Sequence, residues 1–447
     1  MAEGGEGQVK GSAESHQALK KAVELRSLVI GKRELYGNKE AWTSHQRLAA
    51  TYRSILLTDL EFALDRKVEQ ELWNNCFKSQ ISNLQAASKE KRNPKAGAEA
   101  SLTLSWFLEM ASGFYILMLQ EVRQNFGIEL PFFQSADPYG LWRPESKPTE
   151  PCPNQQPTKT SCIYLCQHCL VHLGDIARYR NQMEQAETFY RHAISLAPSS
   201  GQPYNQIAIL EASRQNKLAT VYFYVRAVSL KCPFPAASTN LAKLLGRLGE
   251  GERERSGKVT AATFPPLFLR LHGQLLHAVR PRAALAIGKH LCEALTALVV
   301  EEKGLTTWQL LQVAAVNMWG WEQSRQGSSD PTGLTGEEEL AGGLLASLQA
   351  ALLLAVLMPV YTVQQGRKLL SYHGLPVLRL LLEWAVAHPK VNTSQVFFYF
   401  NDVELDNSIP FPVDQCSMSI VQGADIEGVY LAPSAVAWTC EAAQRGS

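Results

Sequence analysis

The sequence predicts an all-α protein, and three observations lead to that prediction. Two long segments, Glu40–Gln85 and Ala98–Phe126, consist mainly of strong helix formers, with Gly113 as the one weak position. Beyond residue 160, small and aromatic residues recur at the spacing of helical hairpins. Strand-like patterns are nearly absent before residue 390. We therefore expect helices packed on helices up to that point.

Composition narrows the class of protein further. The chain has 447 residues, 46% of them apolar, and a net charge of +1. These values allow roughly two to four domain-sized units and argue against a strongly basic nucleic-acid-binding protein. The nine cysteines are too few for a disulfide scaffold, and the first 20 residues lack the apolar core of a signal peptide. We expect an intracellular, cytoplasmic protein, with shuttling to the nucleus left open.

The N-terminal half is expected to hold one helical domain, residues 15–250, after a flexible N-terminus, residues 1–14. Its two long helices are expected to pack antiparallel, because Asn93-Pro94 between them is a turn signal. Six prolines in residues 137–160 predict a long Pro-rich loop within this domain.

Two tetratricopeptide repeats, residues 167–200 and 201–234, are predicted from positions that recur 34 residues apart. The matching positions are Leu173-Gly174, Ala186, Tyr190, Ala193 and Pro198 in the first repeat, and Ile207-Ala208, Thr220, Tyr224, Ala227 and Cys232-Pro233 in the second. Small residues let the two helices of a repeat approach closely, and the aromatic residue fills the space between them. Two repeats are too few to be stable alone, so we expect them to pack on neighbouring helices.

The C-terminal half is expected to be a helical extension, residues 258–389, after the charged break Gly246–Gly257. Within it, Leu340–Tyr361 carries no charge over 22 residues and is long enough to span a bilayer. Glycine, serine and glutamine dilute its apolarity and no basic cluster flanks it, so a buried helix is favoured and no membrane association is expected. Residues 390–447 form a tail that matches no pattern.

Helical periodicity assigns an inner and an outer face to two segments that carry candidate binding residues. In the first, the inner residues are Val68, Leu72 and Cys76, and the outer residues are Lys67, Glu71, Asn74 and Lys78. In the second, the inner residues are Cys162, Cys166, Cys169, Leu173 and Ile176, and the outer residues are Tyr164, His168, Asp175 and Arg178. Arg178 and Tyr179 together offer a planar fork of donors and a hydroxyl to a phosphate. The alternatives are a solvated charged face in the first segment and a local Asp175–Arg178 ion pair in the second.

A metal site and a catalytic site are both disfavoured. Cys162, Cys166, His168, Cys169 and His172 are potential ligands, but the cysteines share one helix face at core spacing and the histidines point elsewhere. We therefore expect buried cysteines and no metal. The sequence has no Gly-rich phosphate loop, no Gly-x-Ser-x-Gly and no His-Glu-x-x-His. No catalytic residue, no cofactor and no enzymatic activity are predicted.

Several long segments resemble the SMG adaptors of nonsense-mediated mRNA decay, also called the ever-shorter-telomeres-like family. The segments are Thr58–Gln85, Leu108–Glu121, Tyr164–Leu210 and Cys232–Leu241. The resemblance is strongest to the seventh SMG factor and covers roughly residues 15–245. Gly374–Pro389 is similar to part of the helical C-terminal extension of the same family.

The resemblance implies a 14-3-3-like array of helices with embedded tetratricopeptide repeats, followed by a helical-hairpin extension. It implies a non-catalytic adaptor that binds phosphoserine or phosphothreonine peptides on the phosphorylated up-frameshift RNA helicase. Such an adaptor would form a heterodimer with another SMG-family adaptor through the 14-3-3-like domain. It would also bring in mRNA decay factors or a protein phosphatase.

The same resemblance implies which residues bind the peptide. The phosphate-binding Lys and Arg of the family match Lys78 and Arg178, and Tyr179 follows as the comparable Tyr does in 14-3-3 proteins. Asn205 matches a helix position where an Asn would hold the peptide backbone. Gln85 stands where 14-3-3 proteins have a further Arg, which implies a weaker phosphate cradle.

Two other functions stay open. The first is a telomerase- or telomere-associated nucleic-acid binder that uses basic stretches such as Lys89–Lys95, although the modest basic content makes such binding weak or indirect. The second is a generic tetratricopeptide scaffold for unmodified peptides. Members of this branch also carry a long low-complexity C-terminal region that this sequence lacks, so the recruitment of decay factors stays open as well.

Overall fold

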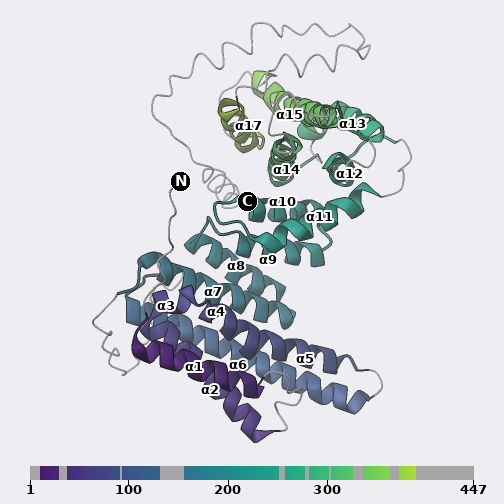
Figure 1. Ribbon diagram of the computed structural model, residues 1–447. Coiled ribbons are helices and arrows are strands. Elements are labelled where there is room, and N and C mark those ends of the chain that lie inside the picture. The colour runs from purple at the N-terminus through teal and green to yellow at the C-terminus, as the bar shows by residue number, and fades with distance from the viewer. Residues whose placement is uncertain are drawn as a thin grey trace, which may run out of the picture. The chain divides into compact units, whose positions relative to one another are not determined.

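The computed structural model describes residues 11–29, 38–90, 93–130, 156–250, 257–276, 281–301, 304–325, 336–362 and 372–388. Helices form nearly all of this part of the chain, and its only extended pairing is an isolated bridge between Ser200 and Cys232. The predicted all-α class is therefore confirmed. Residues 1–10, most of the expected Pro-rich loop and the tail 390–447 lie outside the described residues. The chain divides into two compact units, Met1–Pro198 and Ser199–Ser447 (Figure 1).

The first unit consists of eight α-helices and one π-helix within its described residues. These are α1 (Ala13–Val29), α2 (Lys39–Thr58), α3 (Leu60–Asp65), α4 (Val68–Glu71), the π-helix η1 (Leu72–Lys78), α5 (Ser79–Ser88), α6 (Pro94–Phe126), α7 (Lys159–Tyr179) and α8 (Met183–Leu196). The expected turn at Asn93-Pro94 is present, because the Asn93 side chain caps α6 and Pro94 occupies its first turn. Gly127 ends α6 with a φ of 63°, the left-handed conformation that glycine adopts without strain.

The segment Glu40–Gln85 is not the single helix that its composition predicts. Asp59 ends α2 in a non-helical conformation, and its carboxylate accepts a hydrogen bond from the backbone N–H of Ser12. Lys67 then adopts a left-handed conformation with a φ of 55°. After the short helix α4, residues Leu72–Lys78 form the π-helix η1, whose wider turn departs from 100° per residue. The predicted inner stripe survives these breaks, since Val68, Leu72 and Cys76 are fully buried.

Helix α7 lies in the core of the first unit, where it packs against α3, α6 and α8. Its first turn is tied to α3, because the Glu61 carboxylate accepts hydrogen bonds from the backbone N–H of Thr158 and the hydroxyl of Ser161. Helices α7 and α8 form the hairpin of the first predicted repeat. A Cβ at Gly174 would lie 2.3 Å from the Tyr190 ring, so the repeat needs a glycine there.

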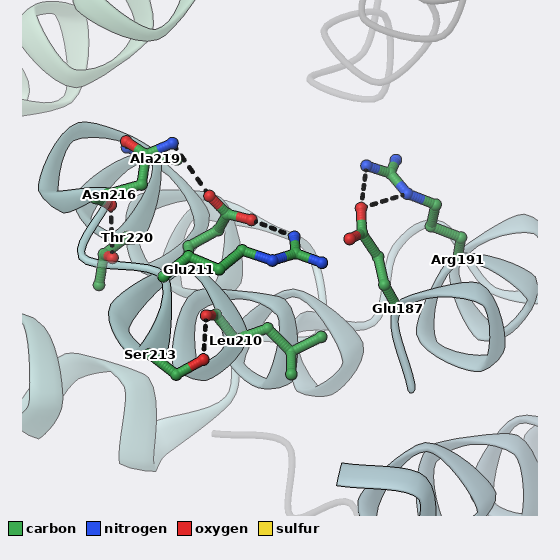
Figure 2. Close-up of polar contacts among 9 residues, drawn as sticks. Glu187, Arg191, Leu210, Glu211, Ser213, Asn216, Ala219 and Thr220 are labelled. Atoms are coloured by element: carbon green, nitrogen blue, oxygen red, sulfur yellow. Dashed lines mark hydrogen bonds and ion pairs between the residues drawn. The ribbon is translucent and has the colours of Figure 1, made fainter. Parts of the chain in front are cut away.

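The second unit contains α9 (Gly201–Ser213), α10 (Lys217–Ser229), α11 (Pro235–Gly249), α12 (Phe264–Leu276), α13 (Pro281–Val300), α14 (Thr307–Arg325), α15 (Gly336–Thr362) and α17 (Leu375–Ala387). Helices α9 and α10 form the hairpin of the second predicted repeat. Glu211 closes the turn between them, accepting hydrogen bonds from Arg214 at 2.7 Å and Asn216 at 3.0 Å (Figure 2). Tyr222 packs edge-on against Trp308 of α14, with ring centroids 5.2 Å apart, and so joins this repeat to the extension.

Two described helices, Pro94–Phe126 and Leu340–Val360, are long and apolar enough to span a membrane by length and composition alone. Half of the most apolar window of the second is buried, and the helix packs against α13 and α14. Asn317 of α14 donates hydrogen bonds to the Leu345 carbonyl and the Gln349 side chain, at 2.9 and 2.7 Å. This burial and these cross-helix bonds agree with the favoured interpretation of Leu340–Tyr361 as a core helix.

Candidate phosphate-binding site

Arg178 lies in the last turn of α7, and a buried carboxylate holds its guanidinium group. Asp175 Oδ1 accepts hydrogen bonds from Arg178 Nη2 at 3.1 Å and from the Tyr190 hydroxyl at 2.8 Å. The Asp175 side chain is 5% exposed, whereas that of Arg178 is 21% exposed. The guanidinium is therefore positioned by the protein core and still reaches the surface.

The prediction that Asp175 and His168 project away from the core is wrong, because both are buried. The prediction fails because α7 packs against three other helices, α3, α6 and α8, so no side of α7 faces solvent along its whole length. His168 Nε2 donates a hydrogen bond to the Glu69 backbone carbonyl, at a distance of 3.2 Å. The local Asp175–Arg178 pair that the sequence left as an alternative is present, but it is a buried support rather than a surface pair.

Both partners of this pair are charged. Burial acts to raise the pKa of Asp175, but His172, Arg178 and Tyr190 outweigh it and hold the pKa below the ordinary value. Burial acts to lower the pKa of Arg178, but the Asp175 charge outweighs it and raises the pKa. A buried, hydrogen-bonded carboxylate thus keeps the guanidinium ionised and fixed in orientation.

Tyr179 lies beside the guanidinium. The Cζ atom of Arg178 is 4.7 Å from the centroid of the Tyr179 ring, which is a cation–π contact. Burial and the Asp175 charge raise the pKa of Tyr179, so its hydroxyl remains a neutral donor. Arg178 and Tyr179 together offer the planar donors and the hydroxyl that the sequence predicts for phosphate binding.

Lys78 is exposed at the C-terminal end of η1. The adjoining part of the π-helix is fixed to α7, because the Trp73 ring stacks on His172 with centroids 3.8 Å apart and an interplanar angle of 15°. The pKa of His172 is lowered by burial and also by the charge of Lys78. The π-helix that ends at Lys78 is therefore packed on α7, the helix that carries Arg178 and Tyr179.

Asn205 belongs to the second unit, on α9. It is buried, its amide donates to Gln206 at 3.3 Å, and its carbonyl oxygen accepts from Asn240 of α11 at 3.4 Å. The Asn205 side chain is thus hydrogen-bonded to Gln206 and Asn240, both within its own unit.

The cysteines of α7 are core residues. Cys162, Cys166 and Cys169 are buried, as predicted, and burial raises the pKa of each thiol. No group of three or more His, Cys, Asp and Glu side chains in the described parts of the chain is arranged to hold a metal ion.

Sequence reasoning missed the supporting roles of Tyr190 and His172. The repeat pattern predicts Tyr190 only as the aromatic residue that fills the space between the two helices, yet its hydroxyl also donates a hydrogen bond to Asp175. The signal was available in principle, since a tyrosine at a buried aromatic position needs a polar partner for its hydroxyl.

Two family models match the chain. The model described as "Telomerase activating protein Est1" matches residues 67–184, and the one described as "Est1 DNA/RNA binding domain" matches residues 186–408. The chain belongs to the Est1-like family. The resemblance to the SMG adaptors is confirmed by similarity to "Nonsense-mediated mRNA decay factor SMG7" of Danio rerio, at 38% identity over 79% of this chain.

The chain is also similar to a telomerase-binding protein and to a chain of solved structure. "Telomerase-binding protein EST1A" of Danio rerio is 30% identical over 44% of this chain. The solved C. elegans SMG5–SMG7 complex contains a chain with a TM-score of 0.56 at 16% identity, covering 85% of this chain and 84% of that chain, which shows the shared fold. The Est1-like chain spans 30% of the length of the SMG7 relative and 12% of the EST1A relative.

Proposed function

We propose that this chain is a non-catalytic adaptor in nonsense-mediated mRNA decay that binds phosphoserine or phosphothreonine peptides. Its target would be the phosphorylated up-frameshift helicase, which it would link to mRNA degradation in the cytoplasm. The observation that carries the proposal is the Arg178 guanidinium, partly exposed and fixed by the buried Asp175. The similarity to a decay factor of the Est1-like family supports the choice of pathway.

The charges around Arg178 suit a phosphorylated ligand. A phosphoserine carries about −1.5 to −2 charge and three strong acceptor oxygens. Lys78 and Arg178 supply two cations from different helices, and Asp175 neutralises only one of them. A dianion at this position would gain a bidentate partner in Arg178, a point charge in Lys78 and a hydroxyl in Tyr179. An unphosphorylated serine has neither the negative charge for Lys78 nor the pair of acceptor oxygens for a bidentate bond to Arg178.

The test is a calorimetric titration with one Ser-Gln peptide from the helicase, prepared with and without phosphate. The wild type, Lys78→Glu and Arg178→Lys would be compared with Lys20→Glu, which reverses an exposed charge on α1. We expect phosphate-dependent binding that Lys78→Glu weakens by about 2–5 kcal/mol and Arg178→Lys weakens through loss of the bidentate fork. Lys20→Glu should bind as the wild type does.

The outcomes separate the candidate functions. Binding of both peptides with equal affinity would contradict the proposal and leave a tetratricopeptide scaffold for unmodified peptides. Phosphate-dependent binding that survives Lys78→Glu would place the phosphate elsewhere on the chain.

The partner proposed for the first unit is another SMG-family adaptor, bound through the outer face of α6. This face carries exposed apolar side chains at helical spacing, which are Leu102, Trp106, Ile116 and Leu117, with exposed fractions of 74, 51, 44 and 56%. Gly113 lies between the two pairs, and a Cβ there would meet no atom within 4 Å. Exposed apolar side chains on either side of a glycine that has no side chain allow a partner helix to pack closely against α6. The likeness to a chain of the solved SMG5–SMG7 complex supports this choice of partner.

A second candidate function rests on the description of one matching family model. The "Est1 DNA/RNA binding domain" model covers residues 186–408, and a telomerase-binding relative is similar to part of the chain. Direct nucleic-acid binding would give an affinity for single-stranded RNA or DNA that falls steeply with salt, because it depends on counterion release. Fluorescence anisotropy at two salt concentrations measures this slope. A flat or absent response would remove this candidate.

A further inference from the structure

His172 of α7 is buried among aromatic rings and lies beside Asp175, the carboxylate that holds Arg178. One face of its ring stacks on Trp73 of η1, Tyr115 of α6 lies at 5.6 Å, and the His168 ring meets it edge-on at 4.3 Å, all between ring centroids. Its side chain is 5% exposed. The ring is therefore buried among aromatic neighbours that hold it beside Asp175.

The two ring nitrogens of His172 have very different surroundings. Nδ1 lies 3.4 Å from Asp175 Oδ2, on the carboxylate whose other oxygen bonds to Arg178 and Tyr190. Nε2 is buried and has no hydrogen-bond partner. A neutral ring that donates from Nδ1 to Asp175 leaves the Nε2 lone pair available for a proton.

The groups that face His172 set its charge state when the site is empty. Lys78 of η1 and Arg178 carry positive charge, and Asp175 carries negative charge. Tyr115 of α6 and Tyr190 of α8 are neutral, because burial raises the pKa of both hydroxyls. His168 is neutral as well, because burial holds its pKa well below the ordinary value. Burial and Lys78 lower the pKa of His172 against the opposing effect of Asp175.

A bound phosphate would change this balance. Its charge of about −2 turns the excess positive charge of Lys78, Arg178 and Asp175 into an excess negative charge. The repulsion from Lys78 that disfavours a protonated ring is then offset.

We propose that His172 takes up a proton when a phosphate dianion binds between Lys78 and Arg178, so that phosphopeptide binding is linked to proton uptake. The inference rests on the proposed function. In this role His172 is a positioning residue: once protonated, it strengthens its bond to Asp175 and adds a positive charge next to the Asp175–Arg178 pair. By linkage, affinity then rises as the pH falls through the range in which only the bound form is protonated.

The experiment is calorimetry of the full chain with the phosphorylated Ser-Gln peptide, in buffers of different ionisation enthalpy. The slope of the observed enthalpy against the buffer enthalpy counts the protons taken up. The phosphate itself takes up protons near its second pKa of about 6, so the wild type is compared with His172→Gln on the same peptide. His168→Gln is the matched control, a neighbouring buried histidine that we expect to leave the proton count unchanged.

We expect more proton uptake by the wild type than by His172→Gln. We also expect the affinity of the wild type, divided by that of His172→Gln, to rise as the pH is lowered from about 8 to about 6. For one proton, this ratio can rise by at most about tenfold per pH unit. Equal proton counts in the two proteins, with phosphate-dependent binding intact, would overturn this inference and leave the proposed function standing. Absence of phosphate-dependent binding in the wild type would instead overturn the proposed function.

A second measurement covers the case in which His172→Gln does not fold. The imidazole carbon resonances of the wild type, labelled at histidine, are followed against pH with and without the phosphopeptide. An upward shift in the pKa of His172 on binding is expected. An unchanged titration of that ring would overturn the proposal without any variant.

Discussion

Arg178 and Lys78 share one proposed ligand, but the fold depends on them to very different extents. Arg178→Glu removes the guanidinium from the buried Asp175 and adds a second carboxylate beside it. We expect this variant to lower the free energy of unfolding by about 2–4 kcal/mol, as for a broken buried ion pair. Lys78 is exposed, so Lys78→Glu should change the free energy of unfolding by less than about 0.5 kcal/mol. Urea denaturation followed by circular dichroism measures the free energy of unfolding of both variants. Equal midpoints for the two variants would show that the fold does not depend on the Asp175–Arg178 pair.

This contrast also shows how much of the site the sequence could predict. Lys78, Arg178 and Tyr179 were identified by resemblance, and the structure places all three in one unit. The burial of Asp175, His168 and His172 could not be predicted from periodicity. Periodicity assigns one inner face to a helix, whereas α7 is covered by neighbours on several sides.

At the scale of elements, composition predicted helices correctly and failed where the backbone departs from the α conformation. Nothing in Glu40–Gln85 resembles a helix breaker, yet the chain bends at Asp59 and Lys67 and widens into η1. Propensity is a weak local preference of a few tenths of a kcal/mol per residue, and packing overrides it. The inner stripe was predicted correctly because burial, rather than helix type, decides which side chains face the core.

The left-handed conformation of Lys67 gives a direct test of this account. A side chain in that conformation costs about 1–2 kcal/mol that glycine does not incur, while glycine loses more backbone entropy on folding. We expect Lys67→Gly to raise the free energy of unfolding by about 0.5–1 kcal/mol. Lys20→Gly, at an exposed position within α1, should lower it by about 1 kcal/mol. Urea midpoints provide the measurement, and destabilisation by both variants would contradict a strained Lys67.

At the scale of the whole molecule, the two predicted repeats fall in different compact units. The boundary between Pro198 and Ser199 separates the hairpin α7–α8 from the hairpin α9–α10. Each hairpin packs on helices of its own unit, α7 on α6 and α10 on α14. This agrees with the expectation that two repeats alone are too few to be stable and need flanking helices.

The assembly proposed for the first unit can be tested on the outer face of α6. Leu102 and Leu117 are exposed and separated by 15 positions, about 22 Å along the helix, which is long enough for a crossing partner helix. We expect Leu117→Glu to weaken association with a related SMG adaptor by more than about tenfold, because burying the new carboxylate costs free energy that the leucine does not. Its free energy of unfolding should stay within about 0.5 kcal/mol of the wild type, since the side chain is exposed.

Leu354→Glu on α15 of the second unit, at a residue 47% exposed, is the matched control and should leave the association unchanged. Sedimentation velocity of the mixed proteins measures the affinities. Equal affinities for the wild type and Leu117→Glu would place the interface elsewhere. Self-association of the wild type that Leu117→Glu abolishes would instead identify a second copy of this chain as the occupant of the α6 face. The two results can be told apart because the mixture and this chain alone are run as separate samples. Comparing the wild type with Leu117→Glu in both samples therefore shows whether the α6 face is an interface and which protein it binds.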